Sequence, residues 1–239
     1  MILKKKTKYR PLYKKFIRLR NNIQFNKKIL KFKKKKWRDL LKFTFPNYKK
    51  YKNKPYTLHK FKISVFASQG NSFKKKYRND SSDIKKFKIF YGNLLKKRLK
   101  KYVSISKQHK NANSHLIEIF ESKLDTVLFR SWFSPSIRKS RQMINHGYVT
   151  VNKKIIKKPS YILKKGDLIE ISSKYHNILK QNLKTKRLNP WFWPKPIPPS
   201  YLIIKYKTMQ IIFGDITNFN FSNYFPFLIN PNSVLTSKK

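Results

Sequence analysis

One short segment carries four side chains that could recognise a polyanion. Arginines and amides recur in it at helical spacing, as Arg138, Arg141, Gln142 and Asn145. Residues three, four and seven apart share one face of a helix. Guanidinium groups bind phosphate through paired hydrogen bonds, and amides can pair with base edges or sugar hydroxyls. The spacing therefore predicts a helix with an RNA-binding face.

The same helix needs a second face that is buried. Ile137, Ser140 and Ile144 recur at i, i+3 and i+7, which is typical of residues that pack on a core. Ser136 is a suitable N-cap for this helix, and Gly147 is a suitable residue to end it. One side of the predicted helix thus packs inward, and the other presents the arginines and amides.

Short strands are expected to follow the helix. Tyr148 to Val151 is strand-like, Asn152-Lys153 are turn residues, and Ile155-Ile156 continue the hairpin. A second turn at Gly166-Asp167 leads into a strand over Leu168 to Ile171. Before the helix, apolar residues at i, i+3 and i+4 predict a companion helix, namely Leu124, Val127 and Leu128. Two helices and a small sheet are therefore predicted from the residues alone.

The whole chain of 239 residues is strongly basic, with 59 Lys and Arg against 9 Asp and Glu and a formal net charge of +50. Such self-repulsion indicates that a polyanion belongs to its normal surroundings. Nucleic acid fits because Lys and Arg release counterions from phosphates, and an anionic membrane surface is the rival. Aromatic residues make up 15%, which favours base stacking mildly, although a single aromatic is more often a core residue.

Several kinds of site are not expected. The absence of Cys excludes disulfides and thiolate metal ligands, and the 5 His lack ligand spacing. No apolar run reaches the roughly 18 residues that span a bilayer, and the N-terminal sequence lacks the apolar region of a secretory signal. We therefore expect no metal, no cofactor, no small-molecule substrate and no membrane partner.

Composition divides the chain into parts. Residues 1–45 are expected to form a basic helical extension, in which Trp37, Leu40 and Leu41 share one face. Residues 46–83, rich in Asn, Pro, Ser and Lys, are expected to form an irregular insert.

Residues 84–117 are expected to hold a helix and then a polar linker from 104 on. Asn93 can cap this helix, with Leu95, Leu99 and Val103 on its buried side. Four lysines on its other side are candidate RNA contacts, although a merely solvated face is the usual meaning of such a pattern. They are Lys96, Lys97, Lys100 and Lys101.

Residues 118–172 contain most of the acidic residues and are the part best suited to fold as an independent RNA-binding domain. Residues 173–239 are expected to pack back on the helical region, because the apolar strand within them needs a partner.

The segment from Glu121 to Ile171 also carries a gapless series of motifs. They are Lys123-Leu124-Asp125, Arg141-Gln142, His146-Gly147, Val151-Asn152, Pro159-Ser160-Tyr161 and Gly166-Asp167. In this order they resemble the S4 RNA-binding domain, in the form found in the small-subunit ribosomal protein S4 family. The flanking FYGNLLKKRLKKYV and PPSYLIIKYKTMQIIFGDI are similar to the segments on either side of that domain in the family.

The resemblance implies an α+β fold: a mostly helical N-terminal region completed by the C-terminal segment, with an inserted S4-type domain of two helices and short antiparallel strands. It implies a non-enzymatic structural role in translation. The protein would bind small-subunit ribosomal RNA at a helix junction in the 5′ part of that RNA, early in assembly. Neighbouring ribosomal proteins, and mRNA near its entry side, would be further partners.

The resemblance adds further residues to the expected RNA-binding set. Lys139 is expected to replace a phosphate contact, because Ile137 stands where the family often has Arg. The added residues are Lys123, Arg130, Ser136, Lys139, His146, Asn152, Lys153 and Lys154. For His146, a capping or packing role stands as the alternative to a base contact.

Two other classes of function remain as alternatives. An RNA-modifying enzyme or another RNA-binding factor could use the domain for targeting. Against the enzyme, Asp215 is the only acidic residue after 171 and no phosphate-binding Gly loop is present. A non-specific polyanion or membrane-surface binder would explain the charge but not the motif series.

The 19 Phe and 14 Tyr against 5 Gly, together with abundant Lys, Asn and Ile, indicate an AT-rich genome. A mitochondrial location is therefore expected, with the plastid as the alternative.

Overall fold

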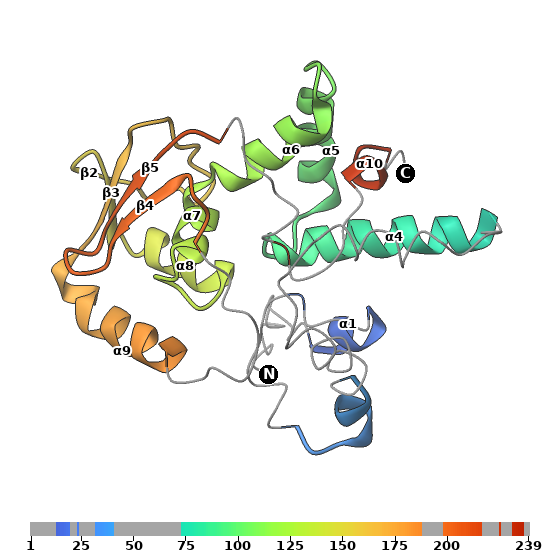
Figure 1. The fold of residues 1–239 in the computed structure, drawn as a ribbon, viewed down its shortest axis with the longest axis horizontal. Coiled ribbons are helices and arrows are strands. Elements are labelled where there is room, and N and C mark those ends of the chain that lie inside the picture. The colour runs from blue at the N-terminus through green and yellow to red at the C-terminus, as the bar shows by residue number, and fades with distance from the viewer. Residues whose placement is uncertain are drawn as a thin grey trace, which may run out of the picture. The chain divides into compact units, whose positions relative to one another are not determined.

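The computed structural model describes residues 13–19, 23, 32–40, 73–187, 198–216, 225 and 231–236. The chain divides into two compact units, residues 1–70 and 71–239, and each is described by itself (Figure 1).

The first unit contains short helical segments, each with a buried apolar side chain. In α1 (Tyr13–Arg18), Phe16 is fully buried. A helical stretch over 35–40 buries Trp37 and Leu40, the two residues that the spacing places on one face. The ring of Phe32 lies 4.8 Å from that of Trp37, centroid to centroid. Leu41 lies outside the described residues.

The second unit begins with helices built around an aromatic cluster. These helices are α4 (Phe73–Phe90), α5 (Lys96–Ser106) and α6 (Ala112–Glu121). Phe87 and Tyr91, at the end of α4, both contact Phe120 of α6, with ring centroids 5.1 and 4.9 Å apart. This aromatic contact fixes the C-terminal end of α4 against α6.

Two expectations for this region were wrong in detail. Residues 73–83, expected as part of an irregular insert, form the first half of α4, because burial of its C-terminal end supports a helix with no Pro or Gly to stop it. Residues 46–72 lie outside the described part. The expected linker over 104–116 is likewise mostly helical, since α5 continues to Ser106 and α6 begins at Ala112.

The start of α5 also differs from the expectation. Asn93 has φ of +59° and does not cap the helix; the N-cap is Leu95, which makes no side-chain cap bond. Leu95 is 65% exposed, whereas Leu99 and Val103 are buried as the spacing predicts. With Asn93 as the N-cap, the helix would begin at Leu94. It begins two residues later, at Lys96, so Leu95 precedes the helix and its side chain does not join the buried face.

The two helices of the motif-bearing segment are α7 (Leu124–Arg130) and α8 (Ile137–Asn145). The N-cap prediction is confirmed, since the Ser136 hydroxyl accepts from the backbone N–H of Lys139 at 3.3 Å. Gly147 follows the helix with φ of +74°, a conformation that favours glycine. Ile137, Ser140 and Ile144 are all buried, as predicted.

Within the described residues, the sheet has five antiparallel strands in the order β2-β1-β3-β5-β4. They are β1 (Val149–Val151), β2 (Lys154–Ile155), β3 (Leu168–Ile171), β4 (Leu202–Lys205) and β5 (Gln210–Phe213). Asn152 and Lys153, between β1 and β2, both have positive φ, as a two-residue type I′ hairpin requires.

The C-terminal segment divides its contacts between the sheet and the helices. We expected 173–239 to pack on the helical region, but β5 pairs with β3, with Ile211 opposite Ile169, so residues 202–213 extend the sheet. The pairing satisfies the edge of β3, and Ile211 and Phe213 continue the apolar face. Further along, the ring of Phe225 lies 5.1 Å from that of Phe90 in α4, centroid to centroid, and α10 (Pro231–Leu235) contacts α4 and α6.

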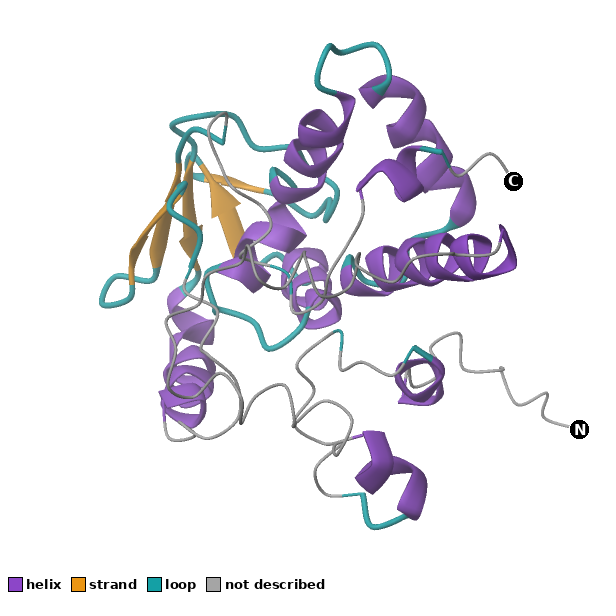
Figure 2. Ribbon diagram, turned by 45° about the vertical axis from the view of Figure 1, so that its right-hand side comes forward, coloured by secondary structure: helices purple, strands orange, loops and turns teal. Residues whose placement is uncertain are grey.

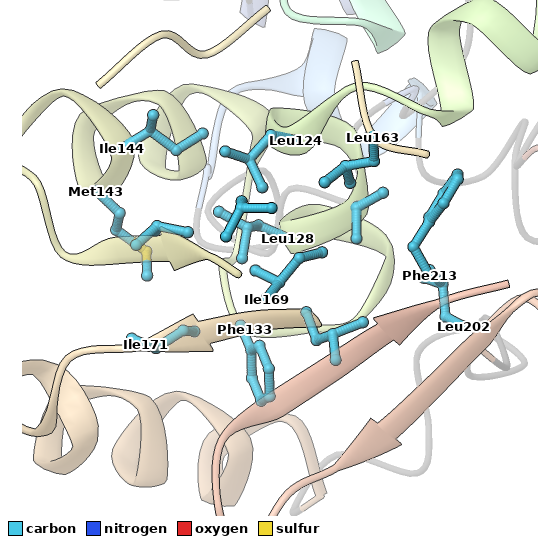
Figure 3. Close-up of a cluster of buried hydrophobic side chains, with 14 of the residues drawn as sticks. Leu124, Leu128, Phe133, Met143, Ile144, Leu163, Ile169, Ile171, Leu202 and Phe213 are labelled. Atoms are coloured by element: carbon cyan, nitrogen blue, oxygen red, sulfur yellow. The ribbon is translucent and has the colours of Figure 1, made fainter. Parts of the chain in front are cut away.

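The core lies between one face of the sheet and the helices α7 and α8. Figure 3 shows Leu124 and Leu128 of α7 on the helical side of this core, near Ile169 of β3. The 3-10 helix η2 (Ser173–Tyr175) and α9 (His176–Arg187) add Tyr175 and Leu179 to this core. Helices and an antiparallel sheet together confirm the predicted α+β class (Figure 2).

None of the helices in the described ranges has the length and apolar character needed to cross a membrane.

Candidate nucleic-acid interface

The outer face of α8 presents part of the predicted RNA-binding set. Gln142 and Asn145 are exposed, and Arg138 and Lys139 are half-buried. Lys139 Nζ donates to Gln142 Oε1 at 3.2 Å, so a cation and an amide already lie side by side on this face. The arrangement offers a positive charge for phosphate and amide groups for bases or sugars.

Arg141 makes hydrogen bonds within the fold, and because 33% of its side chain is exposed, its role as an RNA contact stays a prediction. Its Nε donates to Asp125 Oδ2 at 2.7 Å, in an ion pair with α7. Its Nη1 and Nη2 donate to the backbone carbonyls of Gly92 and Tyr91, at 3.0 and 2.9 Å. The guanidinium group is therefore used to hold α8 against α7 and the end of α4.

Arg130, also predicted to contact RNA, is only 6% exposed and pairs with a fully buried carboxylate. Its Nε and Nη2 donate to Glu121 Oε2 and Oε1 at 2.9 and 2.6 Å. The hydroxyls of Tyr91 and Tyr201 donate to the same carboxylate at 2.6 and 2.8 Å. This prediction was wrong, because Arg130 neutralises a charge inside the fold.

The network shifts the pKa values of its members in directions that follow from its charges. Burial lowers the pKa of Arg130, but the charge and hydrogen bonds of Glu121 outweigh burial, so its pKa lies above the ordinary value. Burial, and then the charge of Glu121, raise the pKa of Tyr91 well above its ordinary value. Glu121 thus joins α4, α7 and the C-terminal segment through one carboxylate.

Lys123 is the second buried member of the predicted set, at 5% exposure. Its Nζ lies 3.8 Å from the ring centroid of Tyr102 and 3.9 Å from that of Phe120. Burial lowers the pKa of Lys123 to about 7. A lysine enclosed by two rings is not presented to RNA, so this prediction is corrected as well.

At the β1–β2 turn, one amide side chain bonds within the fold, and the two lysines that follow it are exposed. Asn152 Nδ2 donates to Asp167 Oδ1 at 2.9 Å, and its Oδ1 accepts from the backbone N–H of Leu168 at 3.0 Å. Asn152 therefore ties the hairpin turn to the turn before β3. Lys153 and Lys154 are exposed beside it and can reach a polyanion.

The remaining predicted residues lie at the ends of α8 and along α5. Ser136 serves as the N-cap, and His146, just after α8, is exposed with its ring stacked on Tyr148. The four α5 lysines, Lys96, Lys97, Lys100 and Lys101, are all exposed and form a second basic surface.

Our sequence reasoning missed three residues of this surface. Lys157 and Lys158, in the loop after β2, are exposed, and Tyr148 is half-buried below His146. In the sequence, the pair Lys157-Lys158 in a loop of the motif-bearing segment could have indicated these two surface cations. In the part of the chain that the structure describes, no group of three His, Asp or Glu residues is placed to hold a metal ion.

Comparison with known proteins covers both the domain and most of the chain. The S4 domain family matches residues 122–169, which run from α7 to β3. The small ribosomal subunit protein uS4c of Eimeria tenella is 31% identical over 199 residues, which are 80% of this chain and 97% of that protein. The chain belongs to the uS4 family of small ribosomal subunit proteins. The resemblance of its motif series to this family is thereby confirmed.

Two other uS4 relatives match over shorter stretches. The uS4m protein of Reclinomonas americana is 31% identical over 166 residues, 68% of this chain and 66% of that protein. The uS4 protein of Aquifex aeolicus is 40% identical over 102 residues, 41% of this chain. Against such bacterial uS4 proteins the chain spans about half of their length, 48% in the Aquifex case. Strands β4 and β5 lie beyond the matched S4 domain although they complete its sheet.

Proposed function

We propose that the protein is a structural component of a small ribosomal subunit and acts by binding folded small-subunit ribosomal RNA. The observation that carries the proposal is a surface of exposed cations and amides on α8 and the β1–β2 turn, in a chain of the uS4 family. Exposed Lys153 and Lys154 supply positive charge, and exposed Gln142 and Asn145 supply groups that can read unpaired bases or sugars.

The binding surface is held rigid by the internal residues. Arg141 joins α8 to the end of α4, and Glu121 joins α4, α7 and the C-terminal segment. Helix α5 belongs to the same packed unit, because Lys123, just before α7, lies with its Nζ 3.8 Å from the ring centroid of Tyr102 in α5. Two basic surfaces at a set distance select a particular RNA shape, which suits docking at a helix junction in the 5′ part of the RNA.

The mechanism proposed is binding without a chemical step. Phosphate neutralisation lowers the repulsion between RNA helices at the junction, so the bound protein stabilises their packing and supports assembly of the subunit. Neighbouring ribosomal proteins, and mRNA near its entry side, are the further partners proposed. An RNA-modifying enzyme and a non-specific polyanion binder are the alternatives that the test below separates.

We place this ribosome in a mitochondrion. The AT-biased composition and the uS4m relative support that location. The plastid is the second candidate, because the uS4c protein of Eimeria tenella aligns along nearly its whole length.

The proposal is tested by UV-crosslinking the protein in lysates of separated mitochondria and plastids and sequencing the attached RNA. Reads concentrated in the 5′ region of one organelle's small-subunit ribosomal RNA are the expected result, and the lysate that yields them identifies the compartment. Reads spread over transfer RNAs, messengers or large-subunit RNA would refute the ribosomal role.

A further inference from the structure

Three aromatic rings form a ladder beside the C-terminal end of α8. The ring of Tyr175 stacks on that of Tyr148, with centroids 5.0 Å apart and planes 29° apart. The ring of Tyr148 is followed by that of His146, nearly parallel at 17° with a centroid distance of 6.0 Å. Parallel, offset rings at such distances are the stacked arrangement that aromatic side chains prefer.

The ladder runs from the core to the solvent. Tyr175 is 5% exposed, Tyr148 is half-buried and His146 is exposed. Tyr148 is held in position by the strands, since its backbone carbonyl accepts from the N–H of Ser172 just after β3. The outermost ring therefore rests on a rigid support and ends the stack at the surface.

One lysine side chain passes close to the exposed end of the ladder, and further polar residues are exposed in neighbouring segments of the chain. A methyl group placed on Gly147 would lie 3.7 Å from Cε of Lys157, so this lysine side chain passes next to the residue that follows His146. Asn145, the residue before His146, is exposed, as are Lys154 and Lys157. A ring with neighbouring cations is the combination that single-stranded nucleic acid uses, with the base stacked and the phosphate neutralised.

We propose that one unpaired nucleobase of the bound RNA stacks on the ring of His146. The base then forms the fourth layer of the Tyr175–Tyr148–His146 ladder. This inference rests on the proposed function and deepens it, because it makes this end of α8 the point that requires a single-stranded nucleotide. Lys157 then contacts the phosphate of that nucleotide or of its neighbour. Every base has a π-face, so the site selects an unpaired nucleotide more than a particular base.

Stacking and phosphate contacts respond differently to salt. A base stacked on a ring releases no counterion, so its loss weakens binding equally at all salt concentrations. Loss of a lysine–phosphate contact instead lowers the slope of log Kd against log salt concentration by about one counterion. The two kinds of contact at the end of α8 can therefore be separated in one set of titrations.

The experiment compares the full chain with His146→Ala, His146→Leu and His146→Phe, each titrated at several salt concentrations. The probes are a transcript of the organelle's small-subunit 5′ domain and an unrelated transfer RNA as reference. Lys157→Ala is the charge variant, and Gln108→Ala, at an exposed position in the turn after α5, is the surface control. Circular dichroism melting verifies that each variant folds.

We expect His146→Ala and His146→Leu to raise Kd for the 5′-domain transcript by about 5- to 150-fold at an unchanged salt slope, the range for one stacked base. His146→Phe keeps an aromatic plane and should stay within about twofold of the unaltered chain. Lys157→Ala should lower the slope by about one, and Gln108→Ala should change neither quantity.

Three results overturn the inference while leaving the proposed function intact. These are an unchanged Kd for His146→Ala, a His146→Phe variant as weak as the Ala variant, and a reduced salt slope for His146→Ala. If the unaltered chain does not prefer the 5′-domain transcript over transfer RNA, the proposed function fails, and the inference fails with it.

Discussion

The guanidinium group of Arg141 lies directly against the backbone of Gly92. Arg141 Nη1 donates to the Gly92 carbonyl at 3.0 Å across 49 residues of sequence, and a Cβ added to Gly92 would lie 2.8 Å from Nη1. Gly92 has φ of +78°, which side chains rarely adopt. The missing side chain of Gly92 thus creates the space in which α8 is tied to the end of α4.

Gly92→Ala should therefore lower the free energy of unfolding by about 1–3 kcal/mol, because it adds backbone strain and displaces the guanidinium group. Urea unfolding measures this change. Gly166→Ala is the matched control, since Gly166 also has positive φ but has no atom within 4 Å of an added Cβ. Equal losses in the two variants would mean that the contact with Arg141 contributes nothing beyond backbone strain.

Replacement of the buried carboxylate should be more damaging. Glu121→Gln leaves the Arg130 guanidinium group buried without its counter-charge, and we expect a loss of about 3–5 kcal/mol in unfolding free energy. The double variant Glu121→Gln with Arg130→Met removes both charges, keeps an oxygen that can accept from the Tyr91 and Tyr201 hydroxyls, and should lose less than the single variant. A double variant that is less stable than Glu121→Gln would show that the ion pair itself stabilises the fold.

The pH dependence of stability should report on Lys123. Its pKa is about 7 in the folded chain, against roughly 10.4 for an ordinary lysine in the unfolded chain. Between these values the unfolded state binds more protons, so this group makes stability rise with pH, by up to about 1.4 kcal/mol per pH unit.

Lys123→Met should therefore be the more stable protein at pH 7, and its advantage over the unaltered chain should shrink towards pH 9.5. Melting temperatures of the two proteins at half-unit intervals from pH 6.5 to 9.5 measure the difference. A constant difference over that range would show that burial leaves the proton affinity of Lys123 unchanged.

Charge removal at one edge of the sheet should affect RNA binding selectively. Replacing Lys153 and Lys154 together by Ala should weaken binding to small-subunit 5′-domain RNA and lower the salt slope by about two counterions. Lys205 and Lys207, exposed on and after β4 at the opposite edge, are the matched pair for the control double variant. Equal slopes for the two double variants would mean that the β1–β2 turn does not face the RNA.

The sequence by itself determined the local elements of the RNA-binding domain. Ser136, Gly147 and the Asn152-Lys153 turn lie where we predicted a helix start, a helix end and a hairpin, because these features depend on backbone preferences within a few residues. The order of motifs from Lys123 to Asp167 was likewise sufficient for the family.

Only the tertiary structure decided which cations remain available to RNA. Periodicity shows which helix face a residue occupies, but the partners of Arg130, Arg141 and Lys123 come from elsewhere in the chain. Arg141 meets Gly92, Arg130 meets a carboxylate that is shared with Tyr201, and Lys123 meets the ring of Tyr102. The pairing of β5 with β3 is non-local in the same way. Contacts of this kind depend on chain segments that packing brings together, and no local pattern in the sequence records them.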